Sequence, residues 1–512
     1  MDEALLLLFY LYNYIACFWA DQFDFAFIET QRVGLYFISY FIAKRVIELW
    51  GLNWLIRLVV IVSIVVVLVN FGLLAVIGMD TSTTSAHPNL LSSFLLLALP
   101  FSIHQIYQKE NEKKWRIFGI IGFVLILIII GLLHTRSVWL GLFLFSALLI
   151  YHYLRRKKSK KWLIFYLISL FLMITAIIMT VFLTDFFDLT SFQERFFVWG
   201  KTMGLIFESP WLGVGPGNWM FHYTKFGVSE FETFKYYGLL MQRPHNDILW
   251  LFSELGILGA TILSVFFWKT LRAGFKAPSS RTKIIFTSAL ISFLPVILLS
   301  FPKERVEHIF LFFTLLAVIT SLSSKNNAIV FKKGGKYIVG LLLIPAFTMV
   351  YYQAVGNYYT KKITVASDKG EYKNVIHNAK KAASPFYLHT PEGLPIASYE
   401  ALGYYKLNET NPFYYYSRRA YFRAPFNYEV LTNFGAALNA VKNFDIAERV
   451  LLEAHRINNS YDGAIFNLAF VYYNKGEYKK AKLWIDRVDY ESEKTEYFSG
   501  LIHEKLNHTE EK

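Results

Sequence analysis

The sequence predicts an all-α protein, in which a polytopic bundle of membrane helices precedes a C-terminal helical solenoid. Of its 512 residues, 55% are hydrophobic, and aromatic residues are as frequent as charged ones, at 18% each. A soluble protein of this length has a more polar composition. The apolar residues form long runs separated by basic clusters, as in membrane proteins, whereas the C-terminal part is charged and repeats itself.

The apolar runs predict about eleven transmembrane helices, because a hydrocarbon core requires roughly 17–25 residues of helix. The second run is the least regular, since Lys44, Arg45 and Glu48 interrupt it. The first run has no basic region before it and no small-residue cleavage site after it, so we interpret it as a retained span rather than a signal peptide. The predicted spans are residues 4–20, 33–50, 54–78, 90–107, 116–134, 136–154, 162–184, 247–268, 284–302, 309–323 and 337–354.

The basic clusters between these spans predict the orientation of the chain in the membrane. The clusters at 109–116, 155–161, 269–283 and 325–336 all fall on one side, which the positive-inside rule assigns to the cytoplasm. The N-terminus is then cytoplasmic. Topology explains the net charge of +14, so no nucleic-acid partner is expected. The single cysteine, Cys17, excludes an internal disulfide and argues against a metal–thiolate site.

Two regions are expected, because a single core stops growing near roughly 250–300 residues. Residues 1–354 are predicted to form the membrane domain and residues 355–512 an extracytoplasmic repeat domain. Within the membrane domain, residues 185–246 form an extracytoplasmic loop that is too long for a connector and unusually aromatic. Loops of this length are usually functional, and this one is the predicted catalytic loop.

The C-terminal region contains a sequence repeat. Two similar segments start 34 residues apart, at Leu431 and Ile465. Small residues occupy the same two places in both copies, and large apolar residues lie between them. The small residues are Gly435 and Ala447 in the first copy and Ala469 and Ala481 in the second. This pattern resembles the tetratricopeptide repeat, so residues 365–510 are predicted to form a short solenoid that binds protein segments or packs on a neighbouring domain.

Polar residues that could carry chemistry gather at the predicted outer face. Arg136 lies in a tight turn between two spans, Arg195 opens the outer loop, and the loop ends in RPHND at 243–247. Each has a structural explanation by itself, because helix-end arginines reach lipid phosphates and a lone histidine is commonly a structural hydrogen-bonding residue. The Gly/Pro turn at 213–218 could likewise be an anion cradle or simply a turn. Together, arginines that bind diphosphate and a histidine that deprotonates a hydroxyl indicate transfer from a lipid-linked phosphate donor.

The ordered set of motifs resembles the O-antigen ligase and polymerase superfamily, which includes the protein O-oligosaccharyltransferases. The likeness covers roughly residues 85–320. The motifs are TRSVWLG (135–141), ER (194–195) followed by SPWLGVGPGN (209–218), HNDILWLFSELGILG (245–259) and, more weakly, HPNLLSSFLLLALP (87–100). The resemblance implies a helical membrane bundle with a large outer loop. It also implies transfer of a glycan from an undecaprenyl-diphosphate carrier to an acceptor hydroxyl, with no metal and no other cofactor.

The resemblance implies roles for individual residues as well. His245 corresponds to the histidine that activates the acceptor, so it is the expected catalytic residue. Binding of the donor diphosphate is expected of Arg136, Arg195, Arg243 and Arg305. Supporting positions are expected at Trp199, Asn218 and Asn246.

Several alternatives remain open from the sequence. The acceptor is lipid A-core, a protein Ser/Thr or another glycan, and the repeats favour a protein acceptor or partner. A non-catalytic membrane scaffold that recruits partners through its repeats is a second hypothesis. A transporter is the third, although transporters place ionisable residues near the bilayer midplane and the candidates here lie at the outer surface. In each case the expected location is the bacterial inner membrane, with multiple spans.

Overall fold

The computed structural model describes residues 2–77, 88–108, 112–157, 161–162, 164, 166, 168, 190–228, 240–276, 280–323, 335–489 and 493–510. Within these ranges the structure is helical and contains no β-strand. Six of the described helices are long and apolar enough to cross a membrane, as expected of a multi-pass membrane protein. Nearly all of the predicted span 162–184 and parts of the predicted loop 185–246 lie outside the described residues.

The membrane bundle contains the described helices before residue 324, apart from those of the 185–246 loop and the short helix at 302–304. They are α1 (Asp2–Ala16), α2 (Phe23–Trp50), α3 (Leu52–Ile77), α4 (Pro88–Tyr107), α5 (Lys113–Leu132), α6 (Arg136–Arg156), α11 (Asp247–Lys276), α12 (Arg281–Ser292), α13 (Leu294–Leu299) and α14 (Val306–Ser321). The predicted span 284–302 is divided between α12 and α13, because Pro295 cannot donate the backbone hydrogen bond that would continue α12. The side chain of Ser280 caps the start of α12 by accepting from the Lys283 N–H.

Helix α2 is longer than predicted and begins ten residues before position 33. The charges that interrupt its apolar pattern have partners. Lys44 donates to Glu3 of α1 at 2.6 Å, in a buried ion pair, and Arg45 pairs with Glu48 at 3.0 Å. Because each charge is compensated, the helix continues to Trp50.

Helix α11 is broken at Gly256, and the loop fills the break. Gly256 has φ 62° and ψ −170°, a backbone conformation open to glycine almost alone. The break removes helical hydrogen bonds, and a turn at 210–215 replaces them. The replacing bonds run from Val214 N–H to the Ser253 carbonyl (2.9 Å), Gly215 N–H to the Glu254 carbonyl (2.9 Å), Ile257 N–H to the Pro210 carbonyl (2.8 Å) and Leu258 N–H to the Trp211 carbonyl (3.3 Å).

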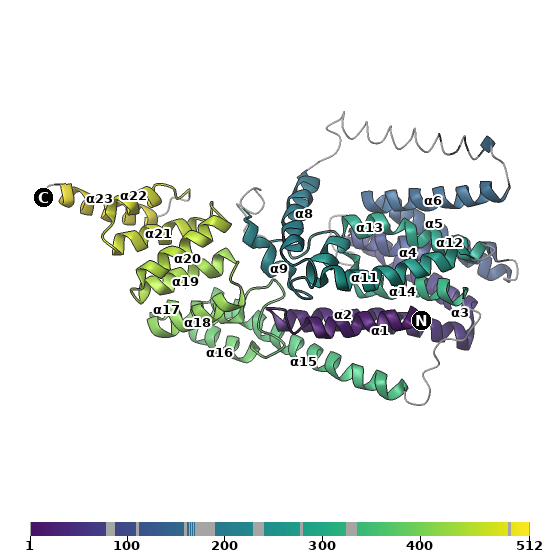
Figure 1. Cartoon of the computed structure of the whole chain (residues 1–512), viewed down its shortest axis with the longest axis horizontal. Coiled ribbons are helices and arrows are strands. Elements are labelled where there is room, and N and C mark those ends of the chain that lie inside the picture. The colour runs from purple at the N-terminus through teal and green to yellow at the C-terminus, as the bar shows by residue number, and fades with distance from the viewer. Residues whose placement is uncertain are drawn as a thin grey trace.

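The catalytic-loop candidate lies at one end of the bundle. Its described helices are α8 (Thr190–Glu208), α9 (Trp219–His222) and η1 (Tyr223–Phe226). Figure 1 shows α8 and α9 at the end of the bundle that faces the C-terminal helices, and we call this the loop end. Helix η2 (Pro302–Glu304), which joins α13 to α14, brings Lys303 and Glu304 to the same end.

The C-terminal helices form successive antiparallel pairs. They are α15 (Gly335–Asp368), α16 (Tyr372–Ala382), α17 (Ile396–Lys406), α18 (Thr410–Arg423), α19 (Tyr428–Ala440), α20 (Phe444–Ile457), α21 (Asp462–Asn474), α22 (Tyr478–Ile485) and α23 (Glu493–Glu510). Small residues allow close crossing, because a Cβ on Gly435 would lie 2.5 Å from the Leu451 Cγ. Ala447, Ala469 and Ala481 are completely buried. Helix α15 continues through residue 354, so one helix carries the chain from the bundle into this unit (Figure 1).

The C-terminal unit is hydrogen-bonded to the loop end. Asp24, in the first turn of α2, accepts from the Leu388 N–H at 2.9 Å. Thr224 of η1 donates its hydroxyl hydrogen to the Phe426 carbonyl at 2.8 Å, and the Val228 N–H donates to the Ile457 carbonyl at 2.8 Å. The bundle, the loop and the C-terminal helices therefore enclose space together.

Candidate active site

His245 stands immediately before α11 in an unusual backbone conformation. Its φ is 53°, in the left-handed region that few residues other than glycine adopt. The next residue, Asn246, is the helix cap, because its side-chain oxygen accepts from the N–H groups of Ile248 (3.1 Å) and Leu249 (3.0 Å). The half-buried His245 ring packs edge-to-face on Phe301, with centroids 4.9 Å apart. Asn246 thus supports the site by starting the helix that carries it.

Trp199 ties α8 to the His245 segment. Its indole N–H donates to the Pro244 carbonyl at 2.8 Å, on the residue that precedes the histidine. Arg195 precedes Trp199 by four residues, so both side chains lie on the same face of α8. Helix α8, which carries Arg195, is therefore hydrogen-bonded to the residue that precedes His245.

Arg136 and Arg195 lie close enough to influence each other. Arg136 is the first residue of α6, and the preceding Thr135 donates to Asn89 and Ser92 of α4, at 3.0 Å each. The pKa of Arg195 is lowered from its ordinary value by burial and, next, by the charge of Arg136. Two like charges held near one another attract an anion placed between them.

Arg243 belongs to a second charged cluster, which the sequence alone did not reveal. Its guanidinium forms a two-pronged ion pair with Glu304 of η2 and lies 4.9 Å from the Phe301 ring centroid. Arg32 of α2 approaches the same carboxylate at 3.9 Å. Burial, and after it the charges of Arg32 and Arg305, lower the pKa of Arg243 to about 10. Phe301 touches both His245 and Arg243, so this cluster adjoins the histidine.

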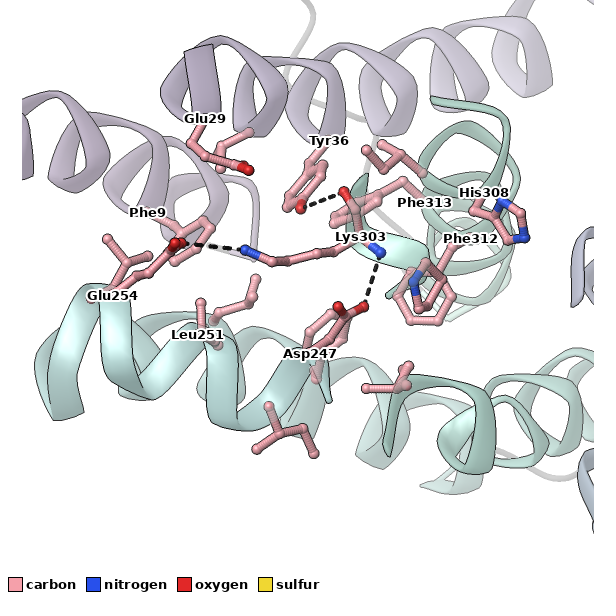
Figure 2. A pocket seen from close by; sticks show the side chains of 18 of the residues that line it. Phe9, Glu29, Tyr36, Asp247, Leu251, Glu254, Lys303, His308, Phe312 and Phe313 are labelled. Atoms are coloured by element: carbon pink, nitrogen blue, oxygen red, sulfur yellow. Dashed lines mark hydrogen bonds and ion pairs between the residues drawn. The ribbon is translucent and has the colours of Figure 1, made fainter. Parts of the chain in front are cut away.

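A half-buried lysine, Lys303 of η2, lies at the loop end. The Lys303 ammonium lies 3.4 Å from Glu254 and 3.4 Å above the Trp250 ring centroid. Its backbone is fixed as well, because Asp247 accepts from its N–H at 2.9 Å and the Tyr36 hydroxyl donates to its carbonyl at 3.2 Å. Figure 2 shows Lys303, Glu254, Asp247 and Tyr36 in the wall of a mostly apolar cavity of about 140 Å³. Lys303 therefore joins α2, α11 and η2.

The Gly/Pro turn is a structural part of the site. The N–H groups of Val214 and Gly215 donate hydrogen bonds to carbonyls in the broken turn of α11, and the Gly213 N–H donates to the Ser209 carbonyl at 3.0 Å. Asn218 is completely buried. Its side chain accepts from the Gln22 N–H at 2.7 Å and donates to the Gln22 carbonyl at 3.2 Å. The anion-cradle interpretation of the turn is wrong for these groups, and Asn218 supports the site by anchoring the start of α2.

The structure thus brings most of the predicted residues to one end of the bundle. Arg195 and Arg136 form one group, and Arg243 and Arg305 another. His245 contacts Phe301 beside Arg243, and the residue before it is hydrogen-bonded to α8, the helix that carries Arg195. Sequence reasoning missed a set of partners that pack among them. They are Glu29, Arg32, Glu254, Phe301, Lys303 and Glu304. The available signal was charge inside apolar surroundings, as in Glu254 within LFSELG.

Comparisons with known proteins support the resemblance. A search of curated proteins found no match. A family model described as O-Antigen ligase matches residues 121–264, a range that includes Arg136, Arg195, Arg243 and His245. That match supports a relationship of this membrane domain to the O-antigen ligase superfamily and, at that level, a membrane glycosyltransferase-like function.

Proposed function

We propose that the protein transfers a glycan from an undecaprenyl-diphosphate carrier to an acceptor hydroxyl, with His245 as the general base. The acceptor oxygen attacks the anomeric carbon while the bond from that carbon to the phosphate oxygen breaks. The imidazole of His245 takes the hydroxyl proton, and the lipid diphosphate leaves with the bonding electrons. The observation that carries this proposal is a constrained histidine connected to the segments that bear two of the arginines: its ring packs on Phe301, which also contacts Arg243, and Trp199 of α8, the helix of Arg195, donates to the carbonyl of Pro244.

The arginines have unequal shares in this proposal. Arg136 and Arg195 are the principal diphosphate-binding pair, because an anion between them relieves the repulsion of two neighbouring cations. Arg243 already holds Glu304 with two prongs, so a diphosphate competes with that carboxylate. We therefore propose that Arg243 and Arg305 contribute to the electrostatic field around the departing diphosphate and that they are not its principal binding residues.

Donor binding separates the arginine roles from the histidine role. Arg136→Ala and Arg195→Ala each remove charge-assisted hydrogen bonds, so the KM for a lipid-linked donor should rise roughly tenfold or more. Arg418→Ala removes an exposed arginine of α18 and serves as the matched control. An unchanged donor KM in both Arg136→Ala and Arg195→Ala would remove the diphosphate assignment.

The membrane orientation is part of the proposal. Basic residues near 113–116, 155–157 and 269–283 cap the bundle helices away from the loop end, so the loop end is extracytoplasmic in a bacterial inner membrane. In a Cys17→Ser background, an impermeant thiol reagent applied to whole spheroplasts should label Ser460→Cys and spare Glu112→Cys. The reverse pattern would invert the orientation.

For the acceptor, we favour a protein Ser/Thr or a protein-presented glycan over lipid A-core. The support is the C-terminal unit, whose sequence repeat resembles the tetratricopeptide repeat and whose helices lie against the loop end. Superhelices of this kind commonly bind polypeptide segments. Transfer to a peptide acceptor but not to lipid A-core, by the purified protein with one lipid-linked donor, is the expected result, and transfer to lipid A-core alone contradicts it.

A further inference from the structure

A second cavity lies where the C-terminal unit meets the loop end. Its volume is about 240 Å³, far above the ~10–15 Å³ that one water needs, so the space admits a group of the size of a sugar ring. Three parts of the chain build its wall: the first turns of α2, the residues around His245, and the C-terminal unit. The wall includes Phe25, Glu29, Arg32, Gln242, Arg243, Trp250, Glu254, Glu304, Gln353 and His389.

His389 lines this cavity and is held rigidly by residues behind it. Its Nδ1 lies 3.0 Å from one Asp24 carboxylate oxygen and 3.2 Å from the other. The ring packs against Phe221 and Phe25, with centroids 5.0 and 5.8 Å away. A carboxylate only accepts, so Nδ1 carries the hydrogen and Nε2 is the ring nitrogen that remains for another partner.

The Nε2 atom of His389 is buried and has no hydrogen-bond partner among the described residues. The His389 side chain is 0% exposed. Buried polar atoms in folded proteins are nearly always hydrogen-bonded, and leaving one unpaired costs about 1–3 kcal/mol. A polar ring atom fixed in orientation beside a polar cavity indicates a ligand that forms a hydrogen bond with it.

The charges of the wall favour a polyhydroxyl ligand over an anion. Three carboxylates, from Glu29, Glu254 and Glu304, line the cavity beside two guanidiniums, from Arg32 and Arg243. Each guanidinium is already paired with a carboxylate, and Glu254 lies beside the Lys303 ammonium, so a phosphate would have to displace a carboxylate from its cation. Sugar hydroxyls both donate and accept, which matches a wall of carboxylates, guanidiniums, amides and an imidazole.

We propose that this cavity is a subsite for one sugar ring, in which a ring hydroxyl forms a hydrogen bond with His389 Nε2. The inference rests on the proposed function for its place in the reaction, since Arg243 and Phe301 link the cavity to His245. It adds that the C-terminal unit completes the sugar-binding site, because His389, Thr390 and Gln353 belong to that unit. The bound ring is a neutral sugar or an amino sugar.

Direct binding tests the subsite. The probes are the methyl glycosides of glucose, galactose, N-acetylglucosamine and glucosamine, followed by saturation-transfer NMR on the purified full-length protein, with inorganic diphosphate as the anionic probe. At least one glycoside should bind, and binding should weaken tenfold or more in His389→Gln. Gln242→Trp fills the cavity while leaving the Asp24–His389 contact intact, and it should have the same effect. Thr364→Trp, on an exposed face of α15, is the matched control.

The outcomes separate this inference from the proposed function. Absence of binding by every glycoside, glycoside binding that survives Gln242→Trp, or binding in this cavity of diphosphate in place of a glycoside overturns the subsite. If the wild-type protein binds no glycoside, and both it and Gln242→Trp transfer glycan at the normal rate, the subsite is overturned and the proposed function stands. A wild-type protein that binds glycosides through His389 but transfers nothing from a lipid-linked donor keeps the subsite and loses the proposed function.

Discussion

The backbone conformation of His245 and two contacts fix its position. Its left-handed backbone turns the chain into α11, the Trp199 indole holds the preceding carbonyl, and the Phe301 ring packs against the imidazole. A side chain held on several sides loses little freedom when it reacts, which favours a defined proton acceptor. The sequence identified the histidine itself, because a titratable group at the start of an apolar helix is conspicuous.

Trp199→Phe should slow transfer without unfolding the protein. It removes one indole–carbonyl hydrogen bond, worth roughly 0.5–1.5 kcal/mol, and so loosens the Pro244–His245 segment. If that loss falls on the transition state, kcat drops roughly two- to tenfold while the donor KM stays constant. Trp484→Phe, in α22, is the control and should leave both constants unchanged. A changed KM with an unchanged kcat in Trp199→Phe contradicts the positioning role.

Lys303→Met should destabilise the bundle strongly. Glu254 is buried, and removing its nearby cation leaves a buried carboxylate uncompensated, at a cost of about 3–5 kcal/mol. Adding Glu254→Gln should recover part of the loss, because the double variant buries no unpaired charge. Denaturant unfolding in detergent measures both, with Lys369→Met at an exposed position as the control. Equal stability of the single and double variants would show that the two residues are not coupled.

The partners of the predicted residues could not be found from sequence. The resemblance assigned a role to Arg305, whereas its neighbours Lys303 and Glu304 form ion pairs in the structure. Glu29 and Arg32 fell between two predicted spans, and only the early start of α2 brings them to the site. Pairing of this kind depends on which helices are neighbours, and apolar periodicity reports which residues are buried but not against what.

At the scale of helices, the apolar runs located the starts of the six candidate spans within three residues, because length and hydropathy determine what crosses a bilayer. Helix α2, in contrast, begins ten residues earlier than predicted. The runs did not predict the break in α11 or the continuity of α15. Gly256 is non-helical because the loop supplies the lost hydrogen bonds, and that is a tertiary effect. Helix α15 continues because tertiary packing orders its C-terminal half, where Ile363 and Ala366 are buried against the C-terminal unit.

Gly256→Ala should displace the 210–215 turn and lower the stability of the bundle by at least about 3 kcal/mol. The new Cβ would overlap the Trp211 carbonyl, and the backbone conformation is strained for any residue with a side chain. Gly131→Ala in α5 is the matched control, since a Cβ there meets open space and alanine favours helix. Thermal unfolding of the two variants should differ clearly. Equal melting would mean that the break is not required.

Ala481→Leu should destabilise the C-terminal unit by roughly 1–3 kcal/mol. Ala481 is fully buried where α22 packs, so three added carbon atoms overfill the crossing. Lys479→Leu adds a comparable apolar side chain to an exposed position two residues away. Hydrogen exchange of the full-length protein should show faster exchange in α21 and α22 for Ala481→Leu only. Unchanged exchange in both variants contradicts the tetratricopeptide-like packing.

At the scale of the whole molecule, the reacting residues belong to parts of the chain that are far apart in sequence. The loop contributes Arg195 and His245, the bundle contributes Arg136 and the cluster around Glu304, and the C-terminal unit closes the neighbouring cavity with His389. Hydrogen bonds from Asp24 and Thr224 hold the C-terminal unit in place. The division into two regions was visible in the composition, but their joint contribution to one cavity required the structure.

The central claim is that His245 supplies the base at this composite site. The direct measurement is glycan transfer from a lipid-linked donor by purified wild-type protein and His245→Ala, at equal amounts of folded protein. Loss of a general base lowers turnover by roughly 10²–10⁴-fold, and the donor KM should remain near that of the wild type, because the arginines are intact. A well-folded His245→Ala protein that transfers glycan at close to the wild-type rate would contradict the account.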